Sequence, residues 1–331
     1  MRFFRFLVIV VLLGGVLAAA AAYLLGMRVG SSTETFVDLP AGVGTDGIAQ
    51  RLAQAGIIRN RYAFDLYKQL HGGTLRAGEY RFDHPANLPE VFARIARGDV
   101  YTHTLVVPEG FNIFDIAQAV KAAGLGDAAE FLKAERRNTA LIADLSPQAD
   151  SLEGYLFPDT YHFSRHTTPE QMLAMMVKRF RTQSRRLGLL DRPDVAKIVT
   201  LASLVEKEVR VGTERPLVAG VFDNRLAAGM PLDTDPSVVY AALLANHWRG
   251  KIYRSDLDFN SPYNTYRHAG LPPGPIANPG VAAIQAALNP TQSDYLYFVA
   301  DAQGHTRFSV DLKEHAKQVQ DYRNSIQAAQ P

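Results

Sequence analysis

The sequence predicts an α+β protein that begins with a transmembrane helix and continues as two folded regions. Three observations predict this organisation. Residues 6–27 form a long run without a charged side chain, residues 36–150 contain an internal repeat, and residues 151–331 alternate helical periodicity with short strand-like runs.

The N-terminal run is long enough to be a membrane anchor, because at roughly 1.5 Å per helical residue it spans a hydrocarbon core of about 30 Å. Arg2 and Arg5 precede the run, and Arg28 follows it. This bias of positive charge predicts that residues 1–5 stay in the cytoplasm and that the rest of the chain is exported. A cleavable signal peptide is the alternative, since residues 18–22 are all alanine, although the apolar run outlasts the usual signal sequence.

The composition is that of a globular protein, and its net charge argues against a strongly polyanionic partner. The chain has 331 residues, 47% of them hydrophobic, and a formal net charge of +2. Cysteine is absent, which excludes disulfides and a thiol nucleophile. His162 and His166 are the only close histidine pair, and no third ligand is evident nearby. We therefore predict no metal and no cofactor, and an exported domain is not expected to bind nucleic acid.

The repeat in the first half has two copies with identical internal spacing. The motifs are Pro-x-Gly, Ile-Ala-Gln and Ala-Gly followed by Ile or Leu, at residues 40–42, 48–50 and 55–57 and again at residues 108–110, 116–118 and 123–125. Such a match indicates one supersecondary unit that is used twice. In each copy a short strand precedes the Pro-x-Gly turn. A helix follows the turn and ends at a glycine.

The first copy continues with a second helix at residues 62–70 and a strand at residues 78–82. The order strand, helix, helix, strand is similar to that of a small sugar-binding module of the LysM type. We therefore predict that residues 36–150 form a duplicated α+β region with a LysM-like unit. A spacer that holds the rest of the protein off the membrane is the alternative, because the order of elements alone is a fold-level analogy.

Residues 151–331 are predicted to form a mixed α+β domain. Thr168, Pro169 and Gln171 have the pattern of a helix start with a capping box. Further helices are expected at residues 193–209, at residues 213–228 with Thr213 as the cap, from Ser237 onward and at residues 312–326. Strand-like runs occupy residues 153–161 and 295–300. The loop at residues 261–280, rich in Pro, Gly, Tyr and Asn, is longer than most structureless connections, which favours a functional role such as a carbohydrate cleft.

Two glutamates, Glu206 and Glu208, end the apolar helical pattern of residues 193–209. A carboxylic acid held against apolar surface keeps its proton near neutral pH, as a general acid requires. Helical spacing places Glu206 toward the apolar face and Glu208 at its edge, so periodicity alone does not choose between them. Geometry favours Glu208, which can be half-buried and still reach a substrate, whereas ion pairing with Arg210 or Arg215 is the structural alternative for both.

Several motifs together resemble one known family. In order, they are AGEYRF, EGYLFPDTY, LASLVEKEV, TERPLVAGVFDNRL, MPLDTDPSVVY, YNTYRHAGLPPGPIANPG and YLYFVAD. Their order behind an N-terminal anchor is similar to that of the YceG-like endolytic murein transglycosylases, and the resemblance covers nearly the whole chain.

The resemblance implies a LysM-like region followed by a lytic transglycosylase domain, on the periplasmic side of the inner membrane. Such enzymes cleave the bond between N-acetylmuramic acid and N-acetylglucosamine in nascent peptidoglycan strands, leave 1,6-anhydromuramyl ends and so limit strand length. The family's catalytic glutamate is the second of the Glu-Lys-Glu triplet, which is Glu208 here. Peptidoglycan is thus the expected substrate, and membrane-bound peptidoglycan synthases are candidate partners.

Three further residues, Asp235, Asn264 and Tyr266, are candidates for orienting sugar or polarising the acid. Asp233 and Asp235 are also suited to turn or helix-cap roles, because an aspartate beside Pro236 commonly has one. Two other functions stay open at this point. One is a muramidase that uses water and a second carboxylate such as Glu206 or Asp235, and the other is a non-enzymatic scaffold that binds glycan.

Overall fold

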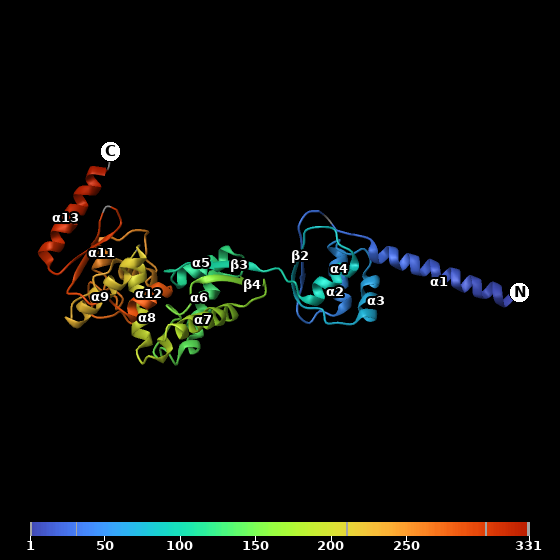
Figure 1. Ribbon diagram of the computed structural model, residues 1–331, viewed down its shortest axis with the longest axis horizontal. Coiled ribbons are helices and arrows are strands. Elements are labelled where there is room, and N and C mark those ends of the chain that lie inside the picture. The colour runs from blue at the N-terminus through green and yellow to red at the C-terminus, as the bar shows by residue number, and fades with distance from the viewer. Residues whose placement is uncertain (1, 31, 210, 302, 330–331) are drawn as a thin grey trace. The chain divides into compact units, whose positions relative to one another are not determined.

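The computed structural model describes residues 2–30, 32–209, 211–301 and 303–329. The chain divides into two compact units. The first comprises residues 1–103 together with residues 162–166, and the second comprises residues 104–161 and 167–331. Figure 1 shows the order of the elements along the chain.

The chain begins with α1 (Arg2–Gly26). Among the residues that the structure describes, no helix combines the length and the apolar character needed to cross a membrane. The transmembrane helix predicted for residues 6–27 is therefore not confirmed.

The rest of the first unit has the predicted order of strand, helix, helix, strand. Its elements are β1 (Thr35–Leu39), α2 (Thr45–Gln54), α3 (Arg61–His71), β2 (Gly78–Phe82) and α4 (Leu88–Arg97). β1 and β2 pair antiparallel, with Thr35 opposite Phe82 and Leu39 opposite Gly78. Leu52, Phe64 and Tyr80 are completely buried in its core. The element order is confirmed, and the likeness to a LysM module stays a prediction.

The second copy of the repeat has the same plan. Its elements are β3 (His103–Val107), α5 (Ile113–Ala122), α6 (Ala128–Arg137) and β4 (Asp159–Phe163), and β3 pairs with β4. The glycines of the two Pro-x-Gly turns, Gly42 and Gly110, both have left-handed backbones, with φ of 85° and 77°. This conformation favours glycine, which explains why the residue recurs. The repeat is thus confirmed at the level of the backbone.

The boundary between the units differs from the predicted boundary at residue 150. The second copy belongs to the unit that contains residues 167–331 and not to the unit of the first copy. Buried hydrogen bonds explain this: the carboxylate of Glu153 accepts from the backbone N–H of Ile113, and the N–H of Gly110 donates to the carbonyl of Asn278. Sequence similarity between the copies does not reveal these contacts.

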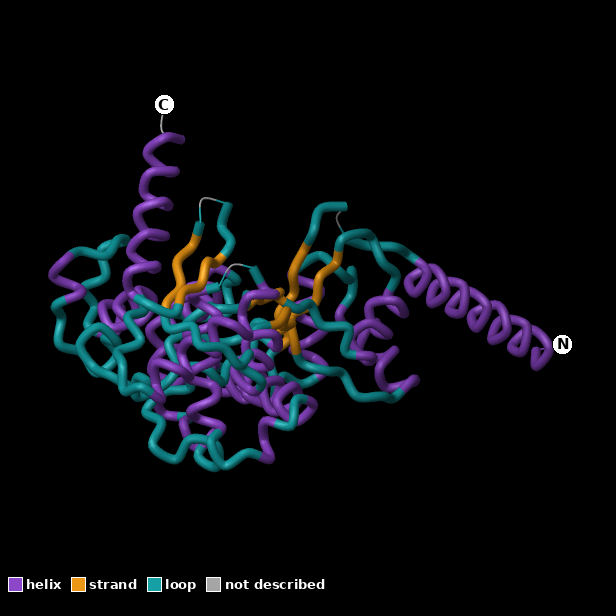
Figure 2. Tube along the Cα trace, turned by 60° about the vertical axis from the view of Figure 1, so that its left-hand side comes forward, coloured by secondary structure: helices purple, strands orange, loops and turns teal. Residues whose placement is uncertain are grey.

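Helices predominate in the remainder of the second unit, and its strands are short (Figure 2). The helices are α7 (Pro169–Arg186), α8 (Val195–Glu208), α9 (Arg215–Ala227), α10 (Asp235–Leu244), α11 (Arg254–Leu257), α12 (Val281–Leu288) and α13 (Leu312–Ala329). The strands β5 (Tyr297–Ala300) and β6 (Thr306–Ser309) pair antiparallel. Single 3-10 turns occupy Thr139–Ile142, Leu189–Asp191 and Gly212–Glu214. The mixed α+β class is confirmed.

The predicted helix starts have different outcomes. Thr168 caps α7 in a full capping box with Gln171, as expected. Thr213 does not cap α9, because it lies in a 3-10 turn and the helix begins at Arg215 without a side-chain cap. The strand-like run at residues 153–161 contains regular strand only from Asp159 onward.

α8 is largely buried and packs against α9 and α12, which makes it a rigid support for its C-terminal glutamates.

Candidate active site

The two glutamates at the end of α8 have different surroundings. Glu206 is almost completely buried, with 4% of its side chain exposed, and it forms an ion pair with Arg215 at 2.6 Å. Its other carboxylate oxygen accepts from the backbone N–H of Gly280 at 3.0 Å. Arg215, one of the two ion-pair partners considered from the sequence, is thus confirmed for Glu206, and Arg210 lies outside the described residues. These contacts give Glu206 a structural role at the end of α8.

Glu208 is the last residue of α8 and lines an open cleft of about 650 Å³. Among the residues that the structure describes, its carboxyl group has neither a hydrogen-bond partner nor an ion pair. The other residues of the cleft come from α9, the connection between α9 and α10, α10, α13, the β5–β6 hairpin and the loop that carries Tyr266. They are Arg225, Leu232, Asp233, Asp235, Tyr266, Tyr297, Phe298, Val299, Ala300, Thr306, Leu312, His315, Val319 and Tyr322.

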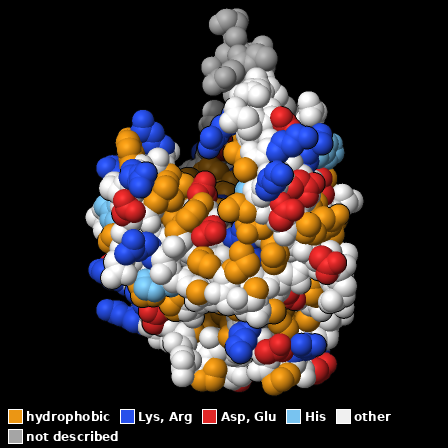
Figure 3. All heavy atoms as spheres, turned by 90° about the vertical axis from the view of Figure 1, so that its left-hand side faces the viewer, with side chains coloured by type: hydrophobic (Ala, Val, Ile, Leu, Met, Phe, Trp, Pro, Cys, Tyr) orange, Lys and Arg blue, Asp and Glu red, His pale blue; other side chains and the backbone are white. Residues whose placement is uncertain are grey.

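The cleft offers both apolar and polar surface to a ligand. Figure 3 shows one face of the molecule, on which hydrophobic side chains lie between scattered charged ones. A volume of several hundred Å³ with mixed lining is typical of sites for small ligands or short polymer segments.

The electrostatic environment of Glu208 keeps its carboxyl group protonated. Burial, followed by the negative charge of Asp235, raises the pKa of Glu208 to about 8. Both effects disfavour the carboxylate. At neutral pH, Glu208 is therefore mainly a neutral acid with a proton to donate, and its position in an open cleft allows the proton to reach a substrate.

Asp235 and Tyr266, two of the candidates named from the sequence, both line the cleft and contact each other. Asp235 is the first residue of α10, and the hydroxyl group of Tyr266 donates to its carboxylate at 2.7 Å. Tyr266 keeps 38% of its surface exposed. Burial, followed by the hydrogen bond to Asp235, raises the pKa of Tyr266, so its phenol stays a donor.

Asn264 does not contact the cleft, contrary to the expectation that it orients sugar. It is completely buried, and its amide donates to the backbone carbonyls of Asp256, Leu257 and Phe259. Its side-chain oxygen accepts from the backbone N–H of Tyr266 at 3.1 Å. Asn264 therefore shapes the loop that presents Tyr266, because all of its polar atoms are used in holding backbone.

Buried hydroxyl groups connect that loop to the start of α10. The hydroxyl oxygen of Thr265 accepts from the backbone N–H of Thr234 at 2.9 Å. The hydroxyl groups of Thr265 and Ser237 are hydrogen-bonded to each other at 2.8 Å. The backbone N–H of Asp233 donates to the carbonyl of Thr265 at 3.3 Å. Asp233 itself has a positive φ of 52°, which is a turn conformation, as its alternative interpretation predicted. The network therefore ties the loop that carries Tyr266 to the start of α10, where Asp235 lies.

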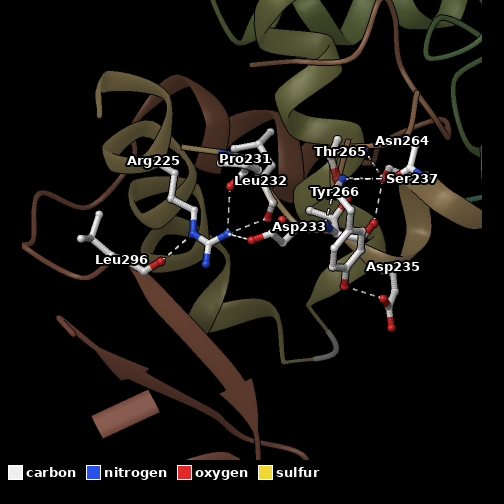
Figure 4. Close-up of polar contacts among 11 residues, drawn as sticks. Arg225, Pro231, Leu232, Asp233, Asp235, Ser237, Asn264, Thr265, Tyr266 and Leu296 are labelled. Carbon is white, nitrogen blue, oxygen red and sulfur yellow. Dashed lines mark hydrogen bonds and ion pairs between the residues drawn. The ribbon is translucent and has the colours of Figure 1, made fainter. Parts of the chain in front are cut away.

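Arg225 is a cleft residue to which the sequence analysis assigned no role. Its Nε donates to the carbonyl of Leu296 at 2.6 Å, and its Nη1 donates to the carbonyls of Pro231 and Leu232 and to the carboxylate of Asp233 (Figure 4). It lies on the buried side of α9, three residues after Phe222. A charged residue in phase with buried apolar positions is the sequence signal that could have identified it.

The Pro/Gly-rich loop before α12 is fixed by three polar side chains. Ser203 of α8 accepts from the backbone N–H of Ile276 at 3.0 Å. Asn278 donates to Glu153 at 2.8 Å and accepts from the backbone N–H of Leu156 at 2.8 Å. Glu206 accepts from Gly280, as described above. Residues 276–280 of the loop therefore support α8, and Tyr266 is the side chain that residues 261–280 contribute to the cleft that contains Glu208.

Comparisons with known proteins agree on one family. The profile of the YceG-like family matches residues 37–321. The endolytic murein transglycosylase of Bacillus subtilis (strain 168) is 32% identical over 342 residues, which cover 95% of this chain and 92% of the relative. The endolytic murein transglycosylase of Streptococcus pneumoniae serotype 2 (strain D39 / NCTC 7466) is also 32% identical, over 91% of this chain, but this chain spans only 61% of that relative.

A solved structure is similar as well. It is a 2.6 Å crystal structure of a yceG-like protein from Listeria monocytogenes, with a TM-score of 0.59 and 34% sequence identity. The similarity covers 87% of this chain and 99% of the other.

Proposed function

This chain belongs to the YceG-like family, and we propose that it is an endolytic murein transglycosylase that cuts within the glycan strands of peptidoglycan. The bond cleaved is the glycosidic bond between N-acetylmuramic acid and N-acetylglucosamine, and each cut leaves a 1,6-anhydromuramyl end. Cleavage of nascent strands limits their length. The observation that carries the proposal is a protonated carboxylic acid, Glu208, in an open cleft of a chain with two curated relatives of this activity.

Glu208 acts twice in the proposed mechanism. Its neutral carboxyl group donates a proton to the glycosidic oxygen while positive charge develops at C1 of the muramyl residue. The resulting carboxylate then accepts the proton of the muramyl C6 hydroxyl, whose oxygen closes on C1. The C1–O bond to the leaving sugar breaks, the C1–O6 bond forms, and Glu208 regains its proton. The reaction consumes no water.

Asp235 and Tyr266 support this chemistry in two ways. The negative charge of Asp235 raises the pKa of Glu208, which favours the acid form before cleavage. The same charge stabilises the positive charge that develops at C1. Tyr266 holds the carboxylate of Asp235 by a hydrogen bond, and its exposed ring offers an apolar face to a sugar.

We place the enzyme on the outer side of the inner membrane, where its substrate lies. The uncharged run at residues 6–27 and the charge bias before it support a single-pass anchor with a cytoplasmic N-terminus. Apolar side chains along α1, such as Phe6, Ile9 and Leu13, are exposed, as lipid-facing residues are. The LysM-like order of elements in the first unit supports glycan binding there, and synthases in the same membrane are candidate partners.

The test is the mass of the products that the full-length protein forms from uncrosslinked peptidoglycan strands. Anhydromuramyl ends within the strands are the expected result. Reducing ends that are heavier by one water would instead identify a muramidase. Strand binding without cleavage would identify a scaffold, and either result would overturn the proposal.

A further inference from the structure

The cleft contains a cationic donor that the proposed chemistry at Glu208 does not use. Arg225 is nine-tenths buried, with 10% of its side chain exposed, and lines the same cleft as Glu208. Four hydrogen bonds engage its Nε and Nη1. Among the described residues, its Nη2 has no partner, and this nitrogen is not sealed from solvent. Figure 4 shows it without a dashed line, directed away from the turn that Nη1 holds.

The orientation of this nitrogen is fixed. The guanidinium lies over the ring of Tyr297 at 5.1 Å, and the ring of His315 stacks on Tyr297 at 5.2 Å. Burial and the charge of Arg225 lower the pKa of His315, so this imidazole is neutral at neutral pH and does not repel the guanidinium. Because a guanidinium is planar, the bonds of Nε and Nη1 also set the direction of the N–H groups on Nη2.

The charges around Arg225 favour a neutral acceptor. Asp233 pairs with the guanidinium at 3.1 Å, and Asp235 lies farther along the same cleft. An incoming carboxylate would be repelled by both of these negative charges, whereas an amide carbonyl oxygen carries no net charge and can still accept a hydrogen bond from the charged guanidinium. The lining of the same cleft includes Leu232, Val299 and Val319, which are apolar surface of the kind that suits an acyl methyl group.

We propose that Arg225 is a specificity-determining residue that binds the carbonyl oxygen of an N-acyl group on the glycan strand through Nη2. Two groups in murein have this chemistry: the acetamido group of the sugars and the lactyl-peptide amide of the muramyl residue. The inference rests on the proposed function and deepens it, since it states which feature of the strand the cleft recognises.

The experiment combines enzyme variants with matched substrates. Full-length wild type and Arg225→Lys are assayed on three strands: intact strands, strands without peptides, and strands with N-deacetylated glucosamine. Lysine keeps the positive charge but loses the planar set of donors. Arg181→Lys is the matched control, because Arg181 likewise binds a backbone carbonyl and an aspartate but lies outside the cleft.

For wild type and Arg181→Lys, removal of the recognised acyl group should lower kcat/KM by about 10- to 100-fold, as expected for a hydrogen bond from a charged donor. For Arg225→Lys the same removal should change kcat/KM by less than about 3-fold, because the bond is already lost. The substrate that shows this pattern identifies the acetamido or the peptide amide as the group bound.

Two results would overturn the inference. One is equal kcat/KM of wild type on all three strands. The other is a fall in kcat/KM that Arg225→Lys causes to the same extent on all three strands, which a purely structural role of Arg225 predicts. If Arg225→Lys does not fold, Arg225→Gln replaces it, because glutamine keeps an amide donor but lacks the forked donors of the guanidinium. An unchanged substrate ratio there would also refute the inference. If wild type forms no anhydromuramyl ends from any strand, it is the proposed function that fails.

Discussion

Glu153 offers a sharp test of how the second unit is held together. Its side chain is buried, accepts from the backbone N–H of Ile113 and from the amide of Asn278, and contacts the hydroxyl group of Tyr240. Burial raises the pKa of Glu153 to about 8. The folded state therefore holds a proton that the unfolded chain, with an ordinary glutamate pKa of about 4.3, releases.

This difference in bound protons makes the stability of the folded state depend on pH. Where the folded state binds more protons, stability falls as pH rises, by at most about 1.4 kcal/mol per pH unit for one group. Stability falls over the pH range between the ordinary glutamate pKa and the folded-state pKa of about 8. Between pH 5 and pH 7 the contribution of Glu153 amounts to about 2.5 kcal/mol, or roughly 5–10 °C in Tm for a unit of this size.

The perturbation is Glu153→Gln, which resembles the protonated acid in shape and cannot ionise. The assay is the thermal unfolding of the full-length wild type and variant at pH 5, 6 and 7. We expect the variant to gain stability relative to wild type as pH rises, by about 2.5 kcal/mol over this range. A difference that stays constant with pH would refute the reasoning, because Glu153 would then ionise equally in both states.

Three further predictions concern the site. First, kcat/KM falls as pH rises through about 8, because Glu208 must be protonated to act as the acid. Asp235→Asn moves this fall in kcat/KM to lower pH, because it removes a negative charge that raises the pKa of Glu208. An unchanged pH profile in this variant would show that the two groups do not interact. Second, Arg215→Met leaves Glu206 buried without its cation and lowers the free energy of unfolding by about 3–5 kcal/mol in a urea titration; a loss below about 1 kcal/mol would contradict the structural role of the pair. Third, Asn264→Ala removes the donors to three carbonyls, so both Tm and activity fall, whereas loss of activity at unchanged Tm would mean that Asn264 contacts substrate after all.

Local patterns in the sequence were sufficient for much of the fold. The capping box at Thr168 and Gln171 is correct because it depends on residues three apart in the chain. The repeat is correct because Gly42 and Gly110 need the same left-handed backbone. The division into compact units differs from the predicted boundary at residue 150 because it depends on pairs distant in the chain, such as Glu153 with Asn278, which are separated by 125 residues.

At the candidate site too, the sequence did not predict contacts between residues that are distant in the chain. Helical spacing predicted that Glu206 and Glu208 differ in burial, but only the structure shows that Arg215 and Gly280 engage Glu206. Asn264 was assigned to substrate because an amide in a Tyr-rich loop suits sugar, and periodicity says nothing about a loop side chain that turns inward. Arg225 was missed because three of its four hydrogen bonds go to backbone carbonyls, those of Leu296, Pro231 and Leu232, and backbone atoms leave no signature in the sequence.

The central claim is that Glu208 supplies and recovers the proton. The most direct measurement is the rate at which the full-length Glu208→Gln variant forms anhydromuramyl ends from uncrosslinked strands, with Glu206→Gln, two residues away on α8, as the matched control. Both variants are assayed at a temperature where each is folded. We predict that Glu208→Gln loses at least about 100-fold in kcat, while Glu206→Gln loses stability but keeps most of its turnover. Turnover by Glu208→Gln at the rate of wild type would contradict the assignment of Glu208.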